Sequence, residues 1–380
     1  TALLDIHERL YQEANGEGVF TGVRIQQPAM VGRFYELAKF QPMWTATGYA
    51  REMLELLRNS YLEGLNPADY HLDELLALKQ EYDEPWSDRD HLRARAEVLL
   101  TDGVMLYARH LREGKVDPRT LDASWNYTRT DFDAGRAAHS LYQAVTERRV
   151  AEALEQLKPQ VPFYASMKDA LAQYRLRAAS EVFAPVPEDP VLRRGDHHAN
   201  VVSLRHRLQQ MGYLQQSTAD RQFDVGVERA VRAMQRDHGL EADGIVGRDS
   251  FAALNLSAAA RVEKLRINLD RLRWMAQDIS DDFVVVNVAG FELYYNRGGQ
   301  LQWETPVMVG AIDTRTPIFR ARLKYLEFNP TWNVPRSILG RSLLPKFKAD
   351  PQYAVAKGYR FLDGKGNPVG PQSIDFQRYT

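Results

Sequence analysis

Hydrophobic residues recur at helical spacing through almost the whole first half of the chain, from about residue 3 to residue 174. Within this region Asn66 and Pro67 are typical of an N-cap and a first helical position, so we expect a helix to begin there. Ser87 and Asp90 resemble a capping box, and the apolar stripe that follows them predicts a long helix. The pattern therefore predicts a helical N-terminal domain.

Three prolines within residues 183–190 indicate a linker to a second, compact unit. In this unit two amphipathic helix faces and a glycine-rich stretch at 239–247 precede a short third helix near 249–254. The apolar residues of the faces are Leu204, Leu208 and Met211 on the first helix, and Val227, Val231 and Met234 on the second. The pattern predicts a small three-helix domain.

A further amphipathic helix follows, and near residue 280 the hydrophobic period changes to that of strands. The helix is indicated by Val262, Leu265, Leu269, Leu272 and Ala276. The runs 283–288, 291–295 and 305–309, divided by glycine-containing turns, predict a meander of hairpins, and residues 323–328 also alternate apolar and polar side chains. The last forty residues predict one short helix and then loop. The expected fold class is α+β with several domains.

Length and composition fit two or three globular domains. The 380 residues exceed the roughly 100–150 that one domain usually has. A net charge of −1 gives no reason to expect nucleic acid, and the basic clusters 193–194 and 205–207 are interpreted as solvated helix faces. No stretch approaches the ~20 apolar residues of a membrane span. The absence of cysteine leaves the redox compartment open, and the start at Thr1, without Met or a leader, suggests a processed or trimmed N-terminus.

The compact unit from about residue 191 to residue 255 resembles the three-helix peptidoglycan-binding module of cell-wall enzymes. The resemblance rests on Leu192 through Asp196, Val202 and Leu204 through Leu208, Met211 through Leu214, Ala230-Val231 with Met234-Gln235, and His238 through Gly247. Turns and helix faces agree over the whole unit. The alternative is a small helical domain that only spaces two others, because fold alone does not establish binding.

Most of the remaining chain resembles the large periplasmic L,D-transpeptidases of the YcbB kind, whose catalytic domain is of the YkuD type. After the module the resemblance rests on Arg261 through Trp274, Phe283 through Leu293 and Asn329 through Ile338. In the helical region it rests on Phe40 through Trp44, Glu63 through His71, Leu100 through Asp102 and Gly114 through Pro118.

This resemblance implies five parts. They are a helical scaffold domain at 1–182, a peptidoglycan-binding-like domain at 191–256, a helix at 257–280 that links back to the scaffold, the N-terminal part of the catalytic domain at 281–336, and the start of a lid subdomain at 337–380.

The chemistry of the family needs residues that this sequence lacks. A cysteine thiolate attacks the amide after the third residue of a tetrapeptide stem, releases D-alanine and holds the stem as a thioester, which an amine of a second stem resolves into a 3→3 crosslink. The family's histidine and Ser-His-Gly-Cys segment follow the Asn-Pro-Thr-Trp stretch, whereas here there is no cysteine and the last histidine is His238. Ser337, Ser342 and Ser373 have no later histidine as a base. No catalytic residue is therefore assigned, and the chain as given is expected to be inactive.

Two interpretations remain open: an enzyme truncated before its catalytic centre, and a natural non-catalytic relative that acts as a peptidoglycan-binding scaffold. In either case the resemblance implies that the region after the Trp-containing loop begins a lid over the substrate cleft. Trp332, Tyr325 and Asn329 are the candidates for lining the donor-peptide groove, although Trp332 is equally suited to pack the sheet against the lid. Lys346 and Lys348 either meet stem carboxylates or form a solvated face.

The partners implied by the resemblance are peptidoglycan stem peptides and, for the scaffold alternative, other cell-wall synthases. No cofactor is expected. No metal site is expected either, because the loop pair His197-His198 lacks a further carboxylate or histidine at the spacing that zinc requires. The implied location is the periplasm, with a role in cell-wall biogenesis and cell shape, and with the signal or anchor segment absent from these residues.

Overall fold

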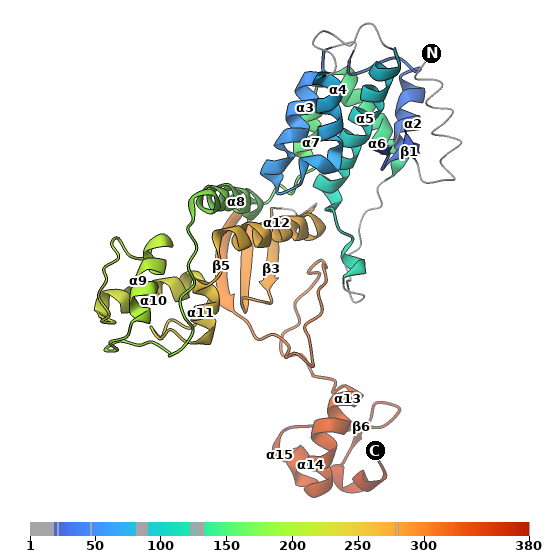
Figure 1. The fold of residues 1–380 in the computed structure, drawn as a ribbon. Helices are drawn as coiled ribbons and strands as arrows, with labels where there is room; N and C mark the ends of the chain where they lie inside the picture. Colours follow the sequence, from blue (N-terminus) through green and yellow to red (C-terminus); the bar gives the residue numbers. More distant parts are fainter. Residues whose placement is uncertain are drawn as a thin grey trace. The chain divides into compact units, whose positions relative to one another are not determined.

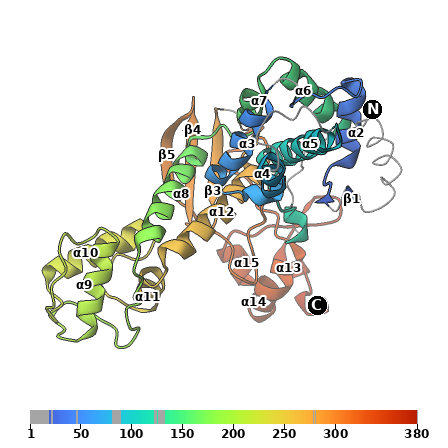
Figure 2. The same cartoon turned by 45° about the horizontal axis from the view of Figure 1, so that its top comes forward.

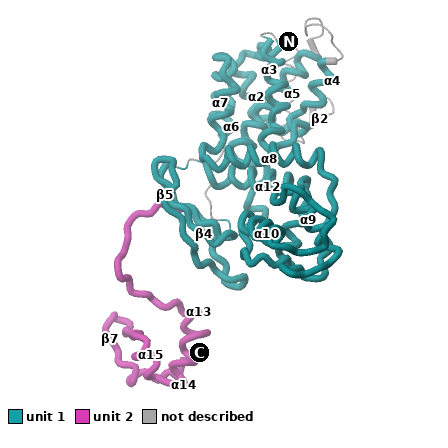
Figure 3. The backbone as a smooth tube through the Cα atoms, turned by 90° about the vertical axis from the view of Figure 1, so that its left-hand side faces the viewer, with its two compact units in different colours: residues 1–320 teal, residues 321–380 magenta. Residues whose placement is uncertain are grey.

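The structure is a computed structural model that describes residues 19–20, 23–45, 48–80, 90–121, 125, 133–277, 279 and 281–379. It divides into two compact units, residues 1–320 and residues 321–380, which Figure 3 shows in separate colours. The predicted α+β multidomain class is confirmed, because the N-terminal part is helical and a small antiparallel sheet follows residue 280.

The first part of unit 1 is a set of helices around the long helix α5 (Asp90–Glu113) (Figure 1). This helix contacts α2, α3, α4 and α6, and its residues Ala96, Val98, Leu99 and Leu100 are completely buried. The other elements are β1 (Val19–Phe20), β2 (Val23–Arg24), α2 (Pro28–Leu37), α3 (Ala50–Arg58), η1 (Asn59–Glu63), η2 (Pro67–Tyr70), α4 (Leu72–Gln80), η3 (Pro118–Thr120), α6 (Ala134–Thr146), α7 (Val150–Gln156) and α8 (Pro162–Ser180). The predicted helical domain is confirmed over the described residues, and the capping box at Ser87 lies outside them.

The predicted helix start at Asn66 is confirmed, but the helix is shorter than expected. The Asn66 side chain accepts a hydrogen bond from the backbone N–H of Ala68, and Pro67 occupies the first position of the single 3₁₀ segment η2. His71 then adopts a left-handed conformation with φ 59°, so α4 has to begin anew at Leu72. A non-glycine residue in this region is sterically unfavourable, which makes His71 a fixed break between two elements.

Two buried carboxylates of α5 hold the N-terminal segments on the helix. Glu97 accepts hydrogen bonds from the Tyr35 hydroxyl and from the backbone N–H groups of residues 43, 44 and 45, at 2.6–3.0 Å. Asp102 accepts from the backbone N–H groups of residues 26 and 27 and from the Nε2 atom of His71. Charge-assisted bonds of this kind are the strong ones, so α5 fixes the chain segments on both sides of α2.

The proline-rich stretch at 183–190 is more ordered than the predicted linker. Val186 is buried in the core of the three-helix unit, and its backbone N–H and C=O both bond to the side chain of Asn255. Proline spacing shows that the segment is extended, but it does not show that a single valine packs into the neighbouring domain. The linker prediction is therefore wrong for Val186, which belongs to that domain.

The predicted three-helix unit consists of α9 (Asn200–Gln210), α10 (Val225–Asp237) and α11 (Arg248–Leu254). The residues predicted on the two helix faces are buried, except Met211, which is half-buried at the edge of the core. Phe223 and Phe251 fill the centre, and the backbone of Leu192 pairs with that of Val246 to close the unit. The unit has a core of its own.

Helix α12 (Ala258–Met275) packs along α8, and Figures 1 and 2 show the two helices side by side. The predicted apolar face is confirmed, because Leu269 and Ala276 are buried against Val161, Tyr164 and Leu171. The N–H of Ala258 bonds to the carboxylate of Glu181, which directly follows α8. The chain thus leaves along α8, builds the three-helix unit and returns along α12.

The predicted meander is confirmed as a sheet of three antiparallel strands in the order β3, β4, β5, but the third strand shares only residues 305–306 with the predicted run 305–309. The strands are β3 (Phe283–Asn287), β4 (Glu292–Arg297) and β5 (Gln300–Pro306). Val284, Tyr295 and Trp303 are directly opposite one another across the three strands and so share one face. The prediction of a strand at residues 323–328 is wrong, because these residues are exposed and irregular. Alternating apolar and polar residues form a strand only where a neighbouring strand is present to pair with them.

Unit 2 contains more structure than the predicted helix and loop. Its elements are α13 (Arg336–Ile338), the π-helical turn η4 (Leu339–Leu343), α14 (Leu344–Ala349), α15 (Gln352–Ala356), β6 (Phe361–Leu362), β7 (Pro368–Val369), η5 (Pro371–Ser373) and η6 (Phe376–Arg378). Phe347 is buried at its centre, with the rings of Tyr353, Tyr359, Phe361 and Phe376 at 5.5–6.3 Å. Aromatic residues scattered among glycines have no sequence period, so this core escaped prediction.

Candidate functional site

The three predicted substrate residues lie in the irregular stretch that opens unit 2. Tyr325 is 78% exposed and Trp332 is 60% exposed, and neither is part of a helix or strand. Asn329 adopts a left-handed conformation with φ 52°, which bends the chain immediately before Pro330. Among the described residues no hydrogen bond or ring contact joins the three side chains, so their common role in a peptide groove stays a prediction.

The described residues do not assemble a nucleophile with a base. The sequence has no cysteine, and none of its nine histidines lies beyond His238. Ser373 donates its hydroxyl hydrogen bond to the backbone C=O of Gly370, which is no proton acceptor for catalysis. In the part of the chain that the structure describes, no cluster of histidine and carboxylate side chains is suited to bind a metal ion.

The three-helix unit is organised by one buried glutamine. The Nε2 atom of Gln235 on α10 donates to Asp243, to the C=O of Ile245 and to Ser250, while its Oε1 atom accepts from the N–H of Gly244. Three of these bonds hold the glycine-rich loop between α10 and α11, and the fourth joins α10 to Ser250 on α11. Gln235 belongs to the residues that carried the resemblance, but its role as the anchor of this loop is visible only in the structure.

The basic cluster at 205–207 is not the solvated face that the sequence predicted. Arg205 and Arg207 are both buried, and only His206 between them points away from the core. Arg205 bonds to Asp224, the carboxylate that caps α10, and to the C=O of Gln222. Two arginines two residues apart on a helix resemble a charged surface in sequence, because their carboxylate partners, Asp224 and Glu181, lie elsewhere in the chain.

Arg207 joins the three-helix unit to the ends of α8 and α12. Its guanidinium donates to Glu181 at 2.6 Å, to the C=O of Leu254 at 2.7 Å and to the C=O of Leu256 at 2.8 Å. The second oxygen of Glu181 accepts from the N–H of Ala258 at the N-terminus of α12, where a negative charge is favourable. One arginine thus contacts both chain segments that connect the unit to the scaffold helices.

A second polar cluster lies where the three-helix unit faces α8 and α12. Burial, together with a hydrogen bond to Asp237, raises the pKa of Tyr213 to about 12, so this tyrosine stays protonated. Burial lowers the pKa of His238, whose Nδ1 atom bonds to the C=O of Met234. The Arg261 guanidinium lies over the ring of Tyr174, 5.8 Å from its centre. The cluster therefore presents a neutral histidine beside a protonated tyrosine.

The joint between η1, α8 and α12 is built on a third buried carboxylate. Glu63 accepts from the hydroxyl of Tyr164 and pairs with Lys158 and Lys168. Burial alone raises the pKa of Glu63, but the two lysines outweigh it and hold this pKa below its ordinary value. Arg273, also buried, donates to the C=O of Glu63 and to Tyr164. The helix after the three-helix unit is thereby fixed to the scaffold.

Three family models match successive parts of the chain. They are described as "Scaffold domain" for residues 29–171, "Putative peptidoglycan binding domain" for residues 197–254 and "L,D-transpeptidase catalytic domain" for residues 281–379. The chain is similar, part by part, to a scaffolded L,D-transpeptidase. The resemblance found in the sequence is confirmed in all three parts, although the exact domain boundaries stay a prediction.

A curated relative supports the same assignment. A protein of Haemophilus influenzae named "Putative L,D-transpeptidase" is 40% identical over 118 residues. This stretch is 30% of the present chain and 23% of the relative, so the chain matches less than a quarter of the relative's length. Among the described residues no helix of unit 1 or unit 2 is long and apolar enough to span a membrane.

Proposed function

We propose that the protein acts as a peptidoglycan L,D-transpeptidase that forms 3→3 crosslinks through a cysteine thioester, in the periplasm, during cell-wall biogenesis. The single observation that supports this best is the order of the three matches, in which a peptidoglycan-binding domain precedes an L,D-transpeptidase catalytic domain on one scaffold. Its substrates are then the stem peptides of peptidoglycan. No residue present here is proposed as catalytic.

In this proposal the residues present here position the substrate. Trp332, Tyr325 and Asn329 line the donor-peptide groove, and their exposure leaves their polar and aromatic surfaces accessible to a peptide. Aromatic rings with a polar end are well suited to hold an extended peptide, because they combine apolar area with a hydrogen-bonding group. The thiolate and the histidine that activates it are not among the 380 residues.

The 380-residue chain by itself should therefore be inactive. Without a nucleophile no thioester forms, and binding alone does not lower the barrier of the chemical step. The test is to incubate the purified chain with a tetrapeptide stem and measure released D-alanine, with a D-alanine carboxypeptidase as the positive control. Release above the level of a buffer blank contradicts the proposed cysteine mechanism.

The alternative function is a non-catalytic peptidoglycan-binding scaffold that acts with other cell-wall synthases. The observation that favours it is the complete core of the three-helix unit, which needs no residue of the catalytic domain. Isolated residues 183–256 should then bind purified sacculi as strongly as the whole chain does. Much weaker binding by the isolated unit contradicts the scaffold function and agrees with substrate contacts in residues 281–379.

A further inference from the structure

The two compact units differ in charge. Residues 321–380 contain ten lysines and arginines and four acidic residues, a net charge of +6, although the whole chain has a net charge of −1. The remaining 320 residues therefore carry −7. The excess is strongest between Arg336 and Arg360, where six basic residues accompany a single acid, Asp350. Charge separated in this way produces a positive potential over one unit.

Three of the four acids of unit 2, Asp350, Asp363 and Asp375, are engaged in local turns. Asp350 accepts from the backbone N–H of Gln352. Asp363 accepts from the N–H groups of Lys365 and Asn367, and these bonds hold its pKa below the ordinary value. Asp375 accepts from the N–H of Gln377. These acidic side chains thus stabilise backbone conformations, and only Asp375 also neutralises a basic residue, Arg378.

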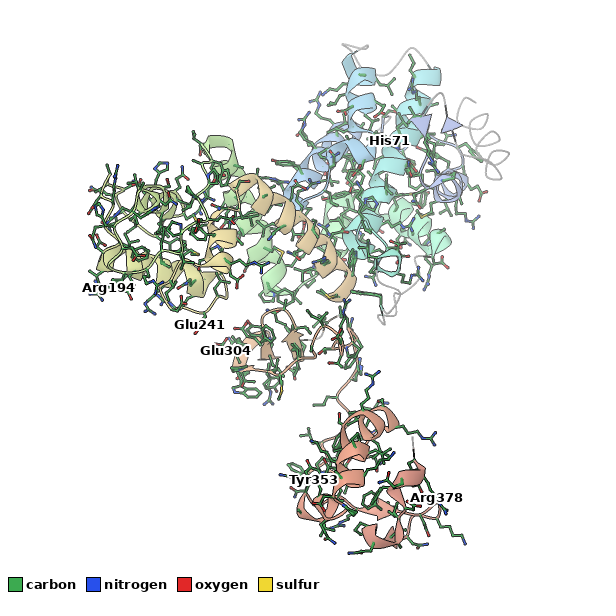
Figure 4. The ribbon with its side chains drawn as sticks, turned by 60° about the horizontal axis from the view of Figure 1, so that its bottom comes forward. His71, Arg194, Glu241, Glu304, Tyr353 and Arg378 are labelled. Carbon is green, nitrogen blue, oxygen red and sulfur yellow. The ribbon has the colours of Figure 1, made fainter. Side chains whose placement is uncertain are left out.

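The basic residues of unit 2 are exposed, except Lys348, which is half-buried, and all but one of them lack an ion pair within the described part of the unit. In residues 321–379, Arg378 is the single basic residue with an ion pair, to Asp375, and Figure 4 shows it on the same unit as Tyr353. Lys346 lies over the ring of Tyr353, with its Nζ atom 5.4 Å from the ring centre. Arg341 and Lys348 are seven residues apart in the helical stretch whose other side, at Leu344 and Phe347, is buried. The helices therefore direct their cations to solvent.

We propose that these six residues form a docking surface, the basic surface, for the free carboxylates of peptidoglycan stem peptides: Arg336, Arg341, Lys346, Lys348, Lys357 and Arg360. The inference rests on the proposed function, because a peptidoglycan substrate is what supplies a dense array of carboxylates to a chain with these domains. Repeated carboxylates on a fixed polymer fit separated single cations, whereas one small anion needs several cations converging on one point. The basic surface gives unit 2 a role of its own: it captures the charged strand by electrostatic attraction.

The experiment measures binding of the full 380-residue chain to purified sacculi by co-sedimentation at low salt. The test variant is the triple substitution Arg341→Gln, Lys346→Gln and Lys348→Gln. The matched control removes the same charge from exposed residues of unit 1, with Arg51→Gln, Lys264→Gln and Arg271→Gln. We expect the test variant to bind about tenfold more weakly, since exposed ion pairs are individually weak and their effects add, and the control to stay within about twofold of the unsubstituted chain.

Two further arms identify the ligand. Sacculi whose carboxylates have been amidated should bind the unsubstituted chain as weakly as ordinary sacculi bind the test variant. Raising the salt concentration should weaken the binding of the unsubstituted chain to sacculi more than that of the test variant, because salt screens exposed charges. Vesicles of phosphatidylglycerol test the other source of anionic groups, and the unsubstituted chain should bind them more weakly than it binds sacculi.

Clear outcomes overturn the inference. Equal binding of the test variant and the control to sacculi excludes the basic surface, and the proposed transpeptidase function still stands if both bind well. Unchanged binding to amidated sacculi excludes carboxylates as the ligand. Loss of vesicle binding in the test variant, with sacculus binding intact, assigns the surface to a membrane. Failure of every protein to bind sacculi contradicts both this inference and the proposed function. Circular dichroism at each step confirms that the variants are folded.

Discussion

Replacing Arg207 by methionine tests whether one buried arginine fixes the peptidoglycan-binding-like unit to its scaffold. The arginine is 2% exposed and its partner Glu181 is 13% exposed, so the pair is almost free of solvent. Methionine fills much of the same volume but donates none of the bonds to Glu181, Leu254 and Leu256. Glu181 then remains buried as a charge whose retained bond comes from the N–H of Ala258.

The expected loss of stability is large. Removing one partner of a buried ion pair typically costs about 3–5 kcal/mol, because the other charge is left uncompensated. In a domain of this size each kcal/mol lowers the melting temperature by about 4–8 °C, so the transition of the three-helix unit should fall by at least about 12 °C. The change should be partly reversed in the double variant Arg207→Met with Glu181→Gln, in which no uncompensated charge remains.

Differential scanning calorimetry of the full chain measures this effect. The matched control is Arg229→Met, an exposed arginine of α10 in the same unit, for which we expect a change within about 0.5 kcal/mol. The reasoning is wrong if Arg207→Met has the same melting temperature as the unsubstituted protein. It is also wrong if the double variant is no more stable than the single variant, because the buried pair is then not what holds the unit. Equal losses for Arg207→Met and Arg229→Met would also refute the reasoning.

Two further predictions concern the buried carboxylates of the scaffold. Glu97→Gln should destabilise the helical domain by about 1–3 kcal/mol in urea unfolding, because the amide N–H₂ of glutamine would face backbone donors that bond to a carboxylate oxygen in the unsubstituted protein. A change below about 1 kcal/mol would show that the segment around Trp44 is held by packing alone. The pKa of Glu63 is lowered in the folded state, so its contribution to stability is present above its ordinary value of 4.5 and is lost as the pH falls below that value. Melting temperature should therefore drop more steeply between about pH 5 and pH 3 in the unsubstituted protein than in Glu63→Gln, and parallel curves would contradict the assignment.

Much of the fold follows from local sequence signals. The faces of α9, α10 and α12 were predicted from apolar spacing, since each helix buries one continuous stripe. The hairpin of β3 and β4 was predicted from short β-type runs between glycine turns, whereas β5 begins five residues before the run predicted for it. These elements depend on residues close in sequence, and a single chain displays such patterns directly.

Other features depend on contacts that no local pattern contains. Arg207 can be buried because it pairs with Glu181, which lies 26 residues away in the sequence and bonds to the first N–H of another helix. The local sequence Arg-His-Arg does not reveal this partner. Phe347 forms a core with aromatic residues drawn from helices, loops and strands, so the sequence predicts only one short helix and loop in this region. The opposite failure occurred at residues 323–328, where alternation suggested a strand but the structure provides no partner for it. The three proposed substrate residues come from the family resemblance, and no hydrogen bond or ring contact joins their side chains in the described part of the chain.

The adjacency of the two segments that contact Arg207 has a consequence for the architecture. Because the end of α8 and the start of α12 meet through Glu181 and Ala258, the three-helix unit is an insertion into a helical hairpin. The hairpin is continuous in space although 77 residues of sequence separate its two helices in the chain. Insertions with neighbouring ends can be removed or exchanged without moving the host. A wall-binding unit of another specificity could therefore be grafted between residues 181 and 258, and the scaffold would carry it in the same place.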